Sequence, residues 1–546
     1  MNRFLKVSLY SAVFIVCCIV IVFSGSRGLS ILPPLIAIGL AFITKQVLIS
    51  LFCGVWSGAL IILFNKGNSF VFSFFSGFLK TADTYVVQGL NEESHIMIVL
   101  FSLMIGGMVG IITASGGMHG IVNALSKRTN TGSKSLILSW ASGVLIFFDD
   151  YANTLIVGNT MRPLTDRYKV SREKLSFVVD ATSAPVASLA ILSTWIGYEV
   201  GLIGDALKNS VLDVDPYSVF IYSLPYRFYA IILILFLPLY ITMKRDFGPM
   251  YDAEKRVKND TADYKHSVSR DFNSFVIPDA SRCKWYSAAI PIIVLIVATF
   301  SGIIISGYMA SDGDNPSIQD IISNANSFKV LMWGSLISSL TAAVTMIVSK
   351  NGTVTDAVNA WTEGVKSMIT AMVILVLAWG LSAVITELKT AENLSFFLSG
   401  TIPLWSFPAI VFVTASIASF ATGTSWGTMA LLFPTALPLA LTLAQNGAVP
   451  IDSFVFIVTG AILTGSIFGD HCSPISDTTI MSSMSCNVSH IEHVRTQMPY
   501  AVTIGAVALF LGYLPAGFFI NPLLLIVIQF AVVFLIFRYL GRKQAE

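Results

Sequence analysis

Long apolar runs separated by short polar connections form the main pattern along the chain. Runs with almost no charged residue cover 95–114, 218–242, 286–305, 329–348 and 519–539. Each has about the 20 consecutive apolar residues that a helix needs to cross the hydrocarbon core of a bilayer. The whole pattern amounts to about 12–14 membrane elements of ~20 residues each, and it predicts an all-α polytopic membrane protein.

Further apolar runs precede the first of these. The run within 1–23 follows Arg3 and Lys6, and it is longer than the roughly 7–15 apolar residues of a signal peptide. We therefore expect a first transmembrane helix whose amino terminus lies in the cytoplasm. Residues 29–44 and 47–64 are predicted to form the second and third spans.

Two runs are interrupted by proline and hydroxyl side chains. Pro185 interrupts the run over 175–195, and Pro474 follows the run over 454–468. Proline lacks an N–H group and its ring clashes with the carbonyl four residues earlier, so both helices are predicted to break. The backbone groups that a break exposes are tolerated at membrane depth only where they line a cavity or bind a solute. The two prolines therefore indicate a site, and we expect the two breaks to face each other.

A polar stretch precedes each interrupted run. Asp149 and Asp150 end one apolar run, and the glycine- and hydroxyl-rich residues 421–428 end another. These stretches predict re-entrant hairpins near 148–162 and 416–443, because neither return segment is apolar over a full span.

The chain thus divides into two corresponding halves, each with a hairpin followed by a proline-broken helix. Residues 1–243 form the first membrane half, and 286–546 form the second, which includes the polar segment 468–483. The long polar segment 244–285 between them carries more Lys and Arg than Asp and Glu, which predicts a cytoplasmic linker. In the second half, residues 356–366 are polar enough to lie at the membrane interface, ahead of a span over 367–385.

Carboxylates and neutral oxygen donors gather around the hairpins and breaks. An aspartate inside a membrane costs about 2.5–3.5 kcal/mol on insertion scales, so it is retained where it has a function. Small hard cations take oxygen ligands. The candidate ligands and proton-linked carboxylates of a Na⁺ or substrate site are Asp149, Asp150, Asn153, Thr154, Asp180, Ser183, Thr422, Ser425, Asp470, Ser473 and Asp477.

Two of these aspartates flank Pro474 and are expected to differ in role. Asp477 lies on the downstream side of the break among serine and threonine hydroxyls, so we expect it to bind the cation directly. Asp470 adjoins His471, whose ordinary pKa near 6.5 suits proton transfer, so we expect a proton-linked partner there. The alternative for 469–483 is a polar loop at the membrane surface, against which the density of hydroxyl groups argues.

At these residues the chain resembles a known family. The segment 468–479, Phe-Gly-Asp-His-Cys-Ser-Pro-Ile-Ser-Asp-Thr-Thr, closely resembles the signature of the NhaC family of sodium/proton antiporters. The resemblance extends over about residues 147–485. It implies two inverted repeats with re-entrant hairpins, an elevator-type movement, and secondary active exchange of Na⁺ (or Li⁺) for H⁺ by a transporter that is not an enzyme and needs no cofactor.

Composition agrees with a transporter driven by an ion gradient. Of the 546 residues, 55% are hydrophobic and 12% are charged, against about 25% charged residues in soluble proteins. No G-x-x-x-x-G-K-[ST] motif is present, so nucleotide hydrolysis is not expected to supply the energy. We expect Na⁺, H⁺ and membrane lipid as partners and no nucleic acid. The sequence leaves open whether the protein forms a homodimer. Basic residues beside the spans predict an integral protein of a bacterial-type inner (plasma) membrane with both termini in the cytoplasm.

Two other functions fit parts of the sequence. Hydroxyl-rich hairpin tips and helix amino termini would also suit a sodium- or proton-coupled exchanger of a small organic carboxylate or amino acid. An intramembrane aspartyl protease is a remote alternative, because the stretch before Asp470 lacks the first glycine of the familiar glycine-x-glycine-aspartate pattern. The histidines of the stretch 490–493, His-Ile-Glu-His, are interpreted as part of a cytoplasmic surface segment.

Overall fold

The computed structural model describes residues 28–44, 46–126, 130–208, 212, 214–259, 283–311, 325–398, 402–447 and 449–543. The predicted span within 1–23 and most of the predicted linker lie outside the described residues. In the described part, ten helices are long and apolar enough to cross a membrane, or eleven if one bent pair counts as a span. The prediction of an all-α polytopic membrane protein is confirmed.

The first half is helical almost throughout its described residues. Its helices are α3 (Leu32–Thr44), α4 (Val47–Asn65), α5 (Phe70–Lys80), η1 (Thr81–Val86), α6 (Val87–Leu90), α7 (Glu93–Ala114), α8 (Gly117–Ser126), α9 (Gly132–Leu145), α10 (Asp150–Arg167), α11 (Arg172–Ala181), α12 (Ala184–Leu189), α13 (Ile196–Leu207), α14 (Pro216–Ser223), η2 (Leu224–Tyr226) and α15 (Phe228–Met243). Strand β1 (Arg245–Asp246) and α16 (Pro249–Asn259) follow in the segment predicted to be the linker.

The second half is also helical almost throughout its described residues. Its helices are α17 (Tyr286–Ala310), α19 (Ser327–Val348), α20 (Val354–Glu387), α21 (Thr390–Leu398), η4 (Leu404–Ser406), α22 (Phe407–Thr422), α23 (Ser425–Gly447), α24 (Ile451–Cys472), α25 (Asp477–Ser485), α26 (His490–Ala508), η5 (Leu509–Tyr513), α27 (Leu514–Ala516) and α28 (Pro522–Leu540). Strand β2 (Arg542–Lys543) pairs antiparallel with β1 and so joins the end of the chain to the end of the first half.

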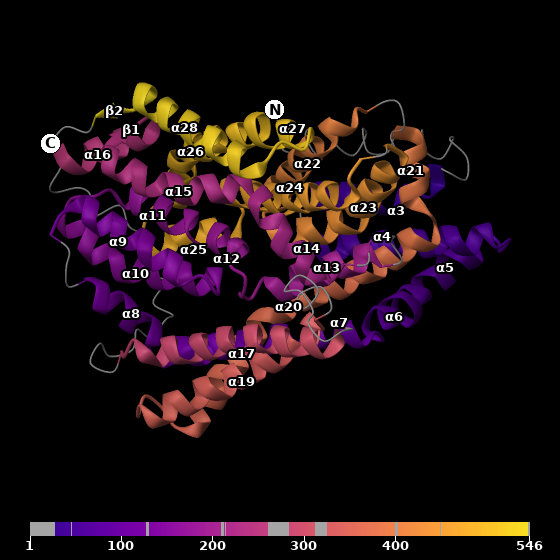
Figure 1. The fold of residues 1–546 in the computed structure, drawn as a ribbon, viewed down its shortest axis with the longest axis horizontal. Coiled ribbons are helices and arrows are strands. Elements are labelled where there is room, and N and C mark those ends of the chain that lie inside the picture. Colours follow the sequence, from indigo (N-terminus) through magenta and orange to yellow (C-terminus); the bar gives the residue numbers. More distant parts are fainter. Residues whose placement is uncertain are drawn as a thin grey trace.

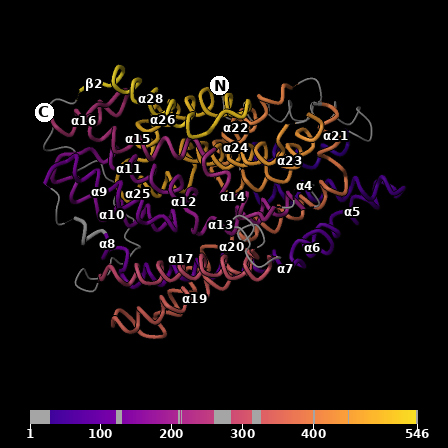
Figure 2. The backbone as a smooth tube through the Cα atoms, in the orientation of Figure 1, coloured from indigo at the N-terminus to yellow at the C-terminus, as the bar shows by residue number. Residues whose placement is uncertain are grey.

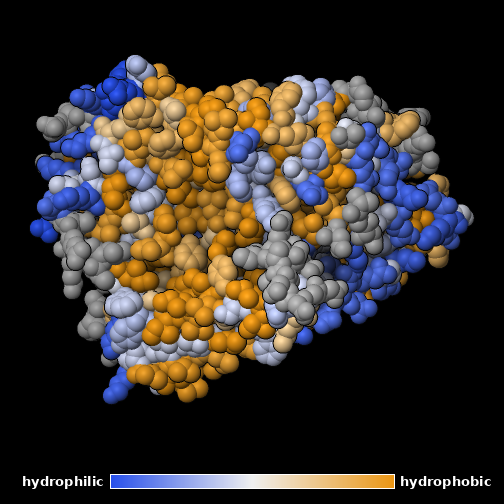
Figure 3. All heavy atoms as spheres, in the orientation of Figure 1, coloured by the Kyte–Doolittle hydropathy of each residue, from blue (hydrophilic) through white to orange (hydrophobic). Residues whose placement is uncertain are grey.

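The helices form two groups that share α20. Helices α7, α17, α19 and α20 pack against one another and form the lower layer in Figure 1. Above them, α10 lies beside α25 and α13 beside α23, although these helices are far apart in the sequence (Figure 2). Helix α20 also packs against α4, α13 and α23, and this contact joins the two groups. Figure 3 shows hydrophobic residues over the middle of this face and hydrophilic residues toward its left and right ends, as expected where the middle lies in lipid.

Several predictions differ from the observed helices. The predicted second span is the 13-residue helix α3, which is shorter than a membrane span. The return segment of the second predicted hairpin, α23, is long and apolar enough to cross a membrane, so the reason given for that hairpin is wrong. The run over 175–195 ends at Leu189 and is followed by the unpredicted helix α13. The run over 218–242 is bent by 51° between η2 and α15, where Pro225 removes one backbone donor. The predicted interfacial segment and the span after it form the single 34-residue helix α20. That helix begins earlier than expected because Thr353 and Asp356 form a capping box.

Candidate ion-binding site

The first hairpin is formed by α9, a short turn and α10. Asp149 occupies the N-cap of α10, where its carboxylate accepts a hydrogen bond of 2.7 Å from the backbone N–H of Ala152. This cap starts the helix because it satisfies one of the N–H groups that the first turn leaves free. Asp150 is the first residue of α10, and both aspartates are buried at the tip of the hairpin.

Asn153 joins the first hairpin to the first helix break. Its amide nitrogen donates to the carbonyls of Gly143, Ile146 and Thr182, at 2.7, 3.1 and 2.8 Å. Gly143 lets the two segments approach closely, because a Cβ atom there would lie 2.1 Å from the Thr182 hydroxyl oxygen. Thr182 lies in the break between α11 and α12, so one side chain holds the hairpin and the broken helix together.

In the second half a side-chain hydrogen bond also joins the hairpin to the helix break, but a serine forms it in place of an asparagine. Helix α24 ends at Cys472 and α25 begins at Asp477, so this helix also breaks at its predicted proline. The hydroxyl of Ser473 in the break donates to the carbonyl of Phe420 in the hairpin helix α22, at 2.8 Å. Gly423 turns the chain at the hairpin tip with φ 72°, and a Cβ atom there would lie 2.6 Å from the carbonyl oxygen of Ile475.

Replacement of Gly423 tests whether this contact between tip and break matters. Gly423→Ala adds a Cβ both at a left-handed φ and against the Ile475 carbonyl, so we expect the unfolding temperature of the purified protein to fall by several degrees. Gly67→Ala is the matched control, because Gly67 has φ 89° and no atom within 4 Å of the added Cβ. Equal unfolding temperatures for the two variants would show that the tip does not depend on the contact.

Asp470 lies where the two halves meet. It is buried, with 4% of its surface exposed, and it accepts a hydrogen bond of 3.2 Å from the hydroxyl of Ser425 at the start of α23. Its carboxylate also interacts electrostatically with Asp150, Asp180 and Asp477. The structure therefore brings together aspartates from both predicted breaks and from the first hairpin.

Asp477 lies in a different environment from the one expected of a dehydrated ligand. Its side chain is exposed at the start of α25, and its carboxylate is 3.5 Å from the phenol of Tyr151, which donates to it. Tyr151 also interacts electrostatically with Asp149, Asp150 and Asp470, so its phenol lies among four of the five candidate aspartates. Tyr151 was not predicted as a site residue, although it directly follows the aspartate pair of the first hairpin.

Asp180 has partners that were not predicted from the sequence. Its Oδ2 atom is 3.2 Å from Nε2 of His493 and accepts a hydrogen bond of 2.8 Å from the amide of Gln497. The same amide donates to the carbonyl of His471 at 2.6 Å, so α26 joins the two helix breaks. His493 is fully buried, and the interpretation of this stretch as a surface segment is therefore wrong for that residue. The four-residue spacing of His493 and Gln497 was the available signal, because it places both side chains on the same face of a helix.

Most of the uncharged candidate ligands donate a side-chain hydrogen bond to a backbone carbonyl. The hydroxyls of Thr154, Ser183 and Thr422 donate to carbonyls three or four residues earlier, at 2.7, 2.7 and 2.9 Å. A hydroxyl oxygen in this state keeps lone pairs for a cation. Among the described residues, buried Oδ1 atoms of Asn153 and Asp180 accept no hydrogen bond, so both have unused acceptor capacity.

The site is not a cage of converging carboxylates. Over the described part of the chain, no three residues among His, Cys, Asp and Glu come close enough to hold a metal ion together. Divalent cations are usually held by several carboxylates, whereas a single carboxylate with hydroxyl and carbonyl oxygens balances one positive charge.

Comparison with known proteins gives relatives over the whole chain and over parts of it. The chain is 33% identical over 514 residues to an uncharacterized protein of Haemophilus influenzae, which covers 92% of this chain and 95% of that protein. It is 32% identical over 143 residues to the malate-2H⁺/Na⁺-lactate antiporter of Bacillus subtilis, or 26% of this chain and 29% of that one. It is 29% identical over 141 residues to the Na⁺/H⁺ antiporter NhaC of Alkalihalophilus pseudofirmus, or 26% and 29% of the two chains.

The fold resembles that of a solved transporter. The crystal structure of the YdaH transporter of Alcanivorax borkumensis superimposes with a TM-score of 0.54 at 14% sequence identity, over 84% of this chain and 90% of that chain. At this identity the likeness concerns the fold alone. The model of the Na⁺/H⁺ antiporter family matches residues 186–518, which include the second hairpin and the second helix break. The chain belongs to the Na⁺/H⁺ antiporter family.

Proposed function

We propose that this protein exchanges Na⁺ (or Li⁺) for H⁺ across the membrane, and that Asp470 is the principal cation ligand. The observation that carries the proposal is the burial of Asp470 between the two halves, beside the Ser425 hydroxyl and near three further aspartates. Family membership supports secondary antiport and favours transport over intramembrane proteolysis.

Competition at one carboxylate couples the two ions. Removal from water disfavours the charged form of a carboxyl group, and a neighbouring carboxylate disfavours it further. A Na⁺ ion next to the carboxyl group favours the charged form instead. Asp470 therefore binds either a proton or a sodium ion, and a carrier that crosses only when one of them is bound exchanges the two.

The exposed position of Asp477 supports a division of roles opposite to the one expected from the sequence. A carboxylate that is more than a third exposed keeps part of its water, and it attracts cations from solution at a lower desolvation cost than a fully buried one. We assign Asp477 to the capture of Na⁺ at the entrance of the site, together with the phenol of Tyr151, and Asp470 to binding of the dehydrated ion.

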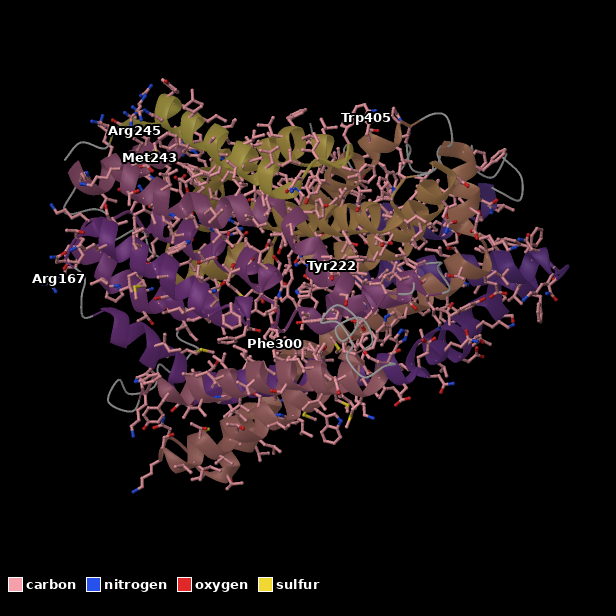
Figure 4. All side chains as sticks on the ribbon, in the orientation of Figure 1. Arg167, Tyr222, Met243, Arg245, Phe300 and Trp405 are labelled. Carbon is pink, nitrogen blue, oxygen red and sulfur yellow. The ribbon has the colours of Figure 1, made fainter. Side chains whose placement is uncertain are left out.

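Movement of the site as a body is the second part of the proposal. The hairpins and breaks are tied to one another by Asn153, Ser473 and Gln497, whereas α7, α17 and α19 pack mainly against one another and against α20. We propose that the tied elements move against these helices in an elevator-type mechanism. Arg167 and Arg245 lie at the same end of the molecule (Figure 4), and by the positive-inside rule we assign this end to the cytoplasm.

Proton flux driven by sodium in proteoliposomes is the direct test. We expect a Na⁺ gradient, and not a K⁺ gradient, to change the internal pH of vesicles that contain the purified protein. Asp149→Asn and Asp150→Asn are each expected to reduce this exchange, because the two carboxylates are adjacent and buried and share protons as a pair. Normal exchange in both variants from pH 6 to about pH 9 would remove the pair from the site, and no sodium response in the unmodified protein would refute the proposed function.

A further inference from the structure

A fully buried ion pair lies outside the proposed sodium site. Glu199 on α13 and Arg227 at the bend between η2 and α15 are both 0% exposed, with 3.3 Å between a carboxylate oxygen and a guanidinium nitrogen. Neither residue was selected from the sequence, because α13 and the bend were not predicted. Charged side chains at membrane depth are rare and mark solute or proton pathways.

The pair is poorly satisfied for a structural ion pair. Neither carboxylate oxygen of Glu199 takes part in a well-aligned hydrogen bond, and the Nε of Arg227 has no acceptor among the described residues. Nη1, the guanidinium nitrogen nearest Glu199, also donates to the carbonyl of Ser188, and Nη2 donates to the hydroxyl of Ser223. The Phe220 ring centre lies 4.4 Å from Cζ. A buried ion pair stabilises a fold when its geometry is excellent and its other protons are satisfied. This pair does not meet that condition.

We propose that Arg227 binds the carboxylate of a small organic acid, and that Glu199 is the internal carboxylate which this ligand displaces. The planar guanidinium group offers two parallel N–H donors to a carboxylate, and its free Nε–H is available for that geometry. When the ligand takes its place, Glu199 loses its counter-charge in a dry environment and takes up one proton. One negative charge enters with the ligand and one is neutralised on Glu199, so the net charge of the site is unchanged.

The surroundings of Glu199 make Arg227 the group that controls its charge. Arg227 is the one charged group that acts on Glu199 in the described structure. The phenol of Tyr513 interacts electrostatically with Arg227 and donates to the carbonyls of Tyr226 and Gly460. Because binding is linked to the uptake of one proton, the affinity for the organic acid rises as pH falls, by up to about tenfold per pH unit while Glu199 is charged in the free protein.

A short segment connects Arg227 to the proposed sodium site. The Arg227 guanidinium donates a hydrogen bond to the carbonyl of Ser188 at the end of α12. Six residues later the backbone N–H of Thr194 donates to the carbonyl of Phe148, at 2.8 Å, next to the aspartate pair of the first hairpin. The next residue, Trp195, lies beside Asp150. A ligand that shifts Arg227 therefore acts on the chain that supports the first hairpin.

Calorimetry on the purified protein in sodium-free detergent solution tests the proposal. The probes are lactate, succinate and glutamate as choline salts, with choline chloride as the inert salt, at pH 5.5 and 7.5. At least one carboxylate is expected to bind, and to bind severalfold more tightly at pH 5.5 than at pH 7.5. No heat from any of the three acids at either pH overturns the proposal. Sodium binding is measured on the same preparation, so its presence without carboxylate binding would leave the proposed antiport intact.

Two variants separate this site from a structural ion pair. Glu199→Gln cannot take up the proton, so it is expected to bind the same acid with no difference between the two pH values. Arg227→Lys lacks the planar fork and is expected to bind at least tenfold more weakly. Should Arg227→Lys fail to fold, the uncharged double variant Arg227→Gln, Glu199→Gln replaces it and is expected to bind no acid. Glu387→Gln removes the carboxylate of the exposed pair with Lys66 and should keep the pH difference. A pH difference retained in Glu199→Gln, or full affinity without Arg227, would contradict the assignment.

Discussion

Asp470→Asn is expected to abolish sodium-driven exchange and to lower the affinity for Na⁺ at least a hundredfold. The Asp470 carboxylate is buried and accepts a hydrogen bond of 3.2 Å from the Ser425 hydroxyl. An ion bound there has lost its water, so its affinity depends on the negative charge of the carboxylate. Removal of one partner of a buried charged contact costs about 3–5 kcal/mol, which corresponds to a factor of more than a hundred in affinity. Isothermal titration with NaCl in choline buffer measures the affinity, and flux in proteoliposomes measures exchange.

The chain provides two comparisons for this variant. Asp452→Asn alters an exposed aspartate in the first turn of the same helix, α24, and is expected to keep both affinity and exchange. Asp477→Asn is expected to slow sodium capture and to make the rate less dependent on ionic strength, while it keeps most of the affinity. If Asp477→Asn instead eliminates sodium binding and Asp470→Asn alters only the pH dependence, the roles are those first expected from the sequence.

Asn153→Ala disconnects the first hairpin from the first helix break. The variant leaves the carbonyls of Gly143, Ile146 and Thr182 without the donor that they share, and each buried carbonyl without a partner costs about 1–3 kcal/mol. It also removes the Oδ1 acceptor. We expect a large fall in unfolding temperature and loss of exchange in the fraction of protein that folds.

Asn159→Ala is the matched control, on the same helix two turns further along. The Asn159 amide donates at 2.9 Å to the carbonyl of Leu155 within α10, so its loss leaves the hairpin and the break joined. Asn153→Asp keeps the Oδ1 acceptor and replaces the NH₂ donor with a second oxygen, and it is expected to resemble Asn153→Ala in stability. A stable and active Asn153→Ala would show that the hairpin is held by packing alone.

The helix breaks could be predicted from sequence because their cause is local. Proline removes one intrahelical donor, and Pro185 and Pro474 lie within a few residues of the ends of α11 and α24, where serine and threonine accompany them. Proline alone does not decide a break, because Pro163 and Pro434 lie inside continuous helices. The hairpin tips were predictable for a similar reason, since Asp149 caps a helix and Gly423 adopts a conformation that glycine favours.

The partners of the site could not be predicted, because they come from helices distant in sequence. Nothing near Asp180 in the chain indicates that His493 and Gln497 on α26 will reach it. The ion pair of Glu199 and Arg227 has the same origin, and it also depended on a helix that the apolar pattern does not show. The exposure of Asp477 is a property of packing, and a list of polar residues near a proline cannot distinguish it from the burial of Asp470.

The division of the site between two halves has a consequence for biosynthesis. Asp150 and Asp470 are 320 residues apart in the chain, and a ribosome adding 5–20 residues per second needs about 16–64 s to make the intervening part. During that time the aspartates of the first hairpin are already made, whereas Ser425, Asp477 and the helix that carries Gln497 do not yet exist. A nascent chain arrested after α16 therefore carries a complete first hairpin with none of the second-half groups that face it, and it is a natural substrate for membrane-protein quality control.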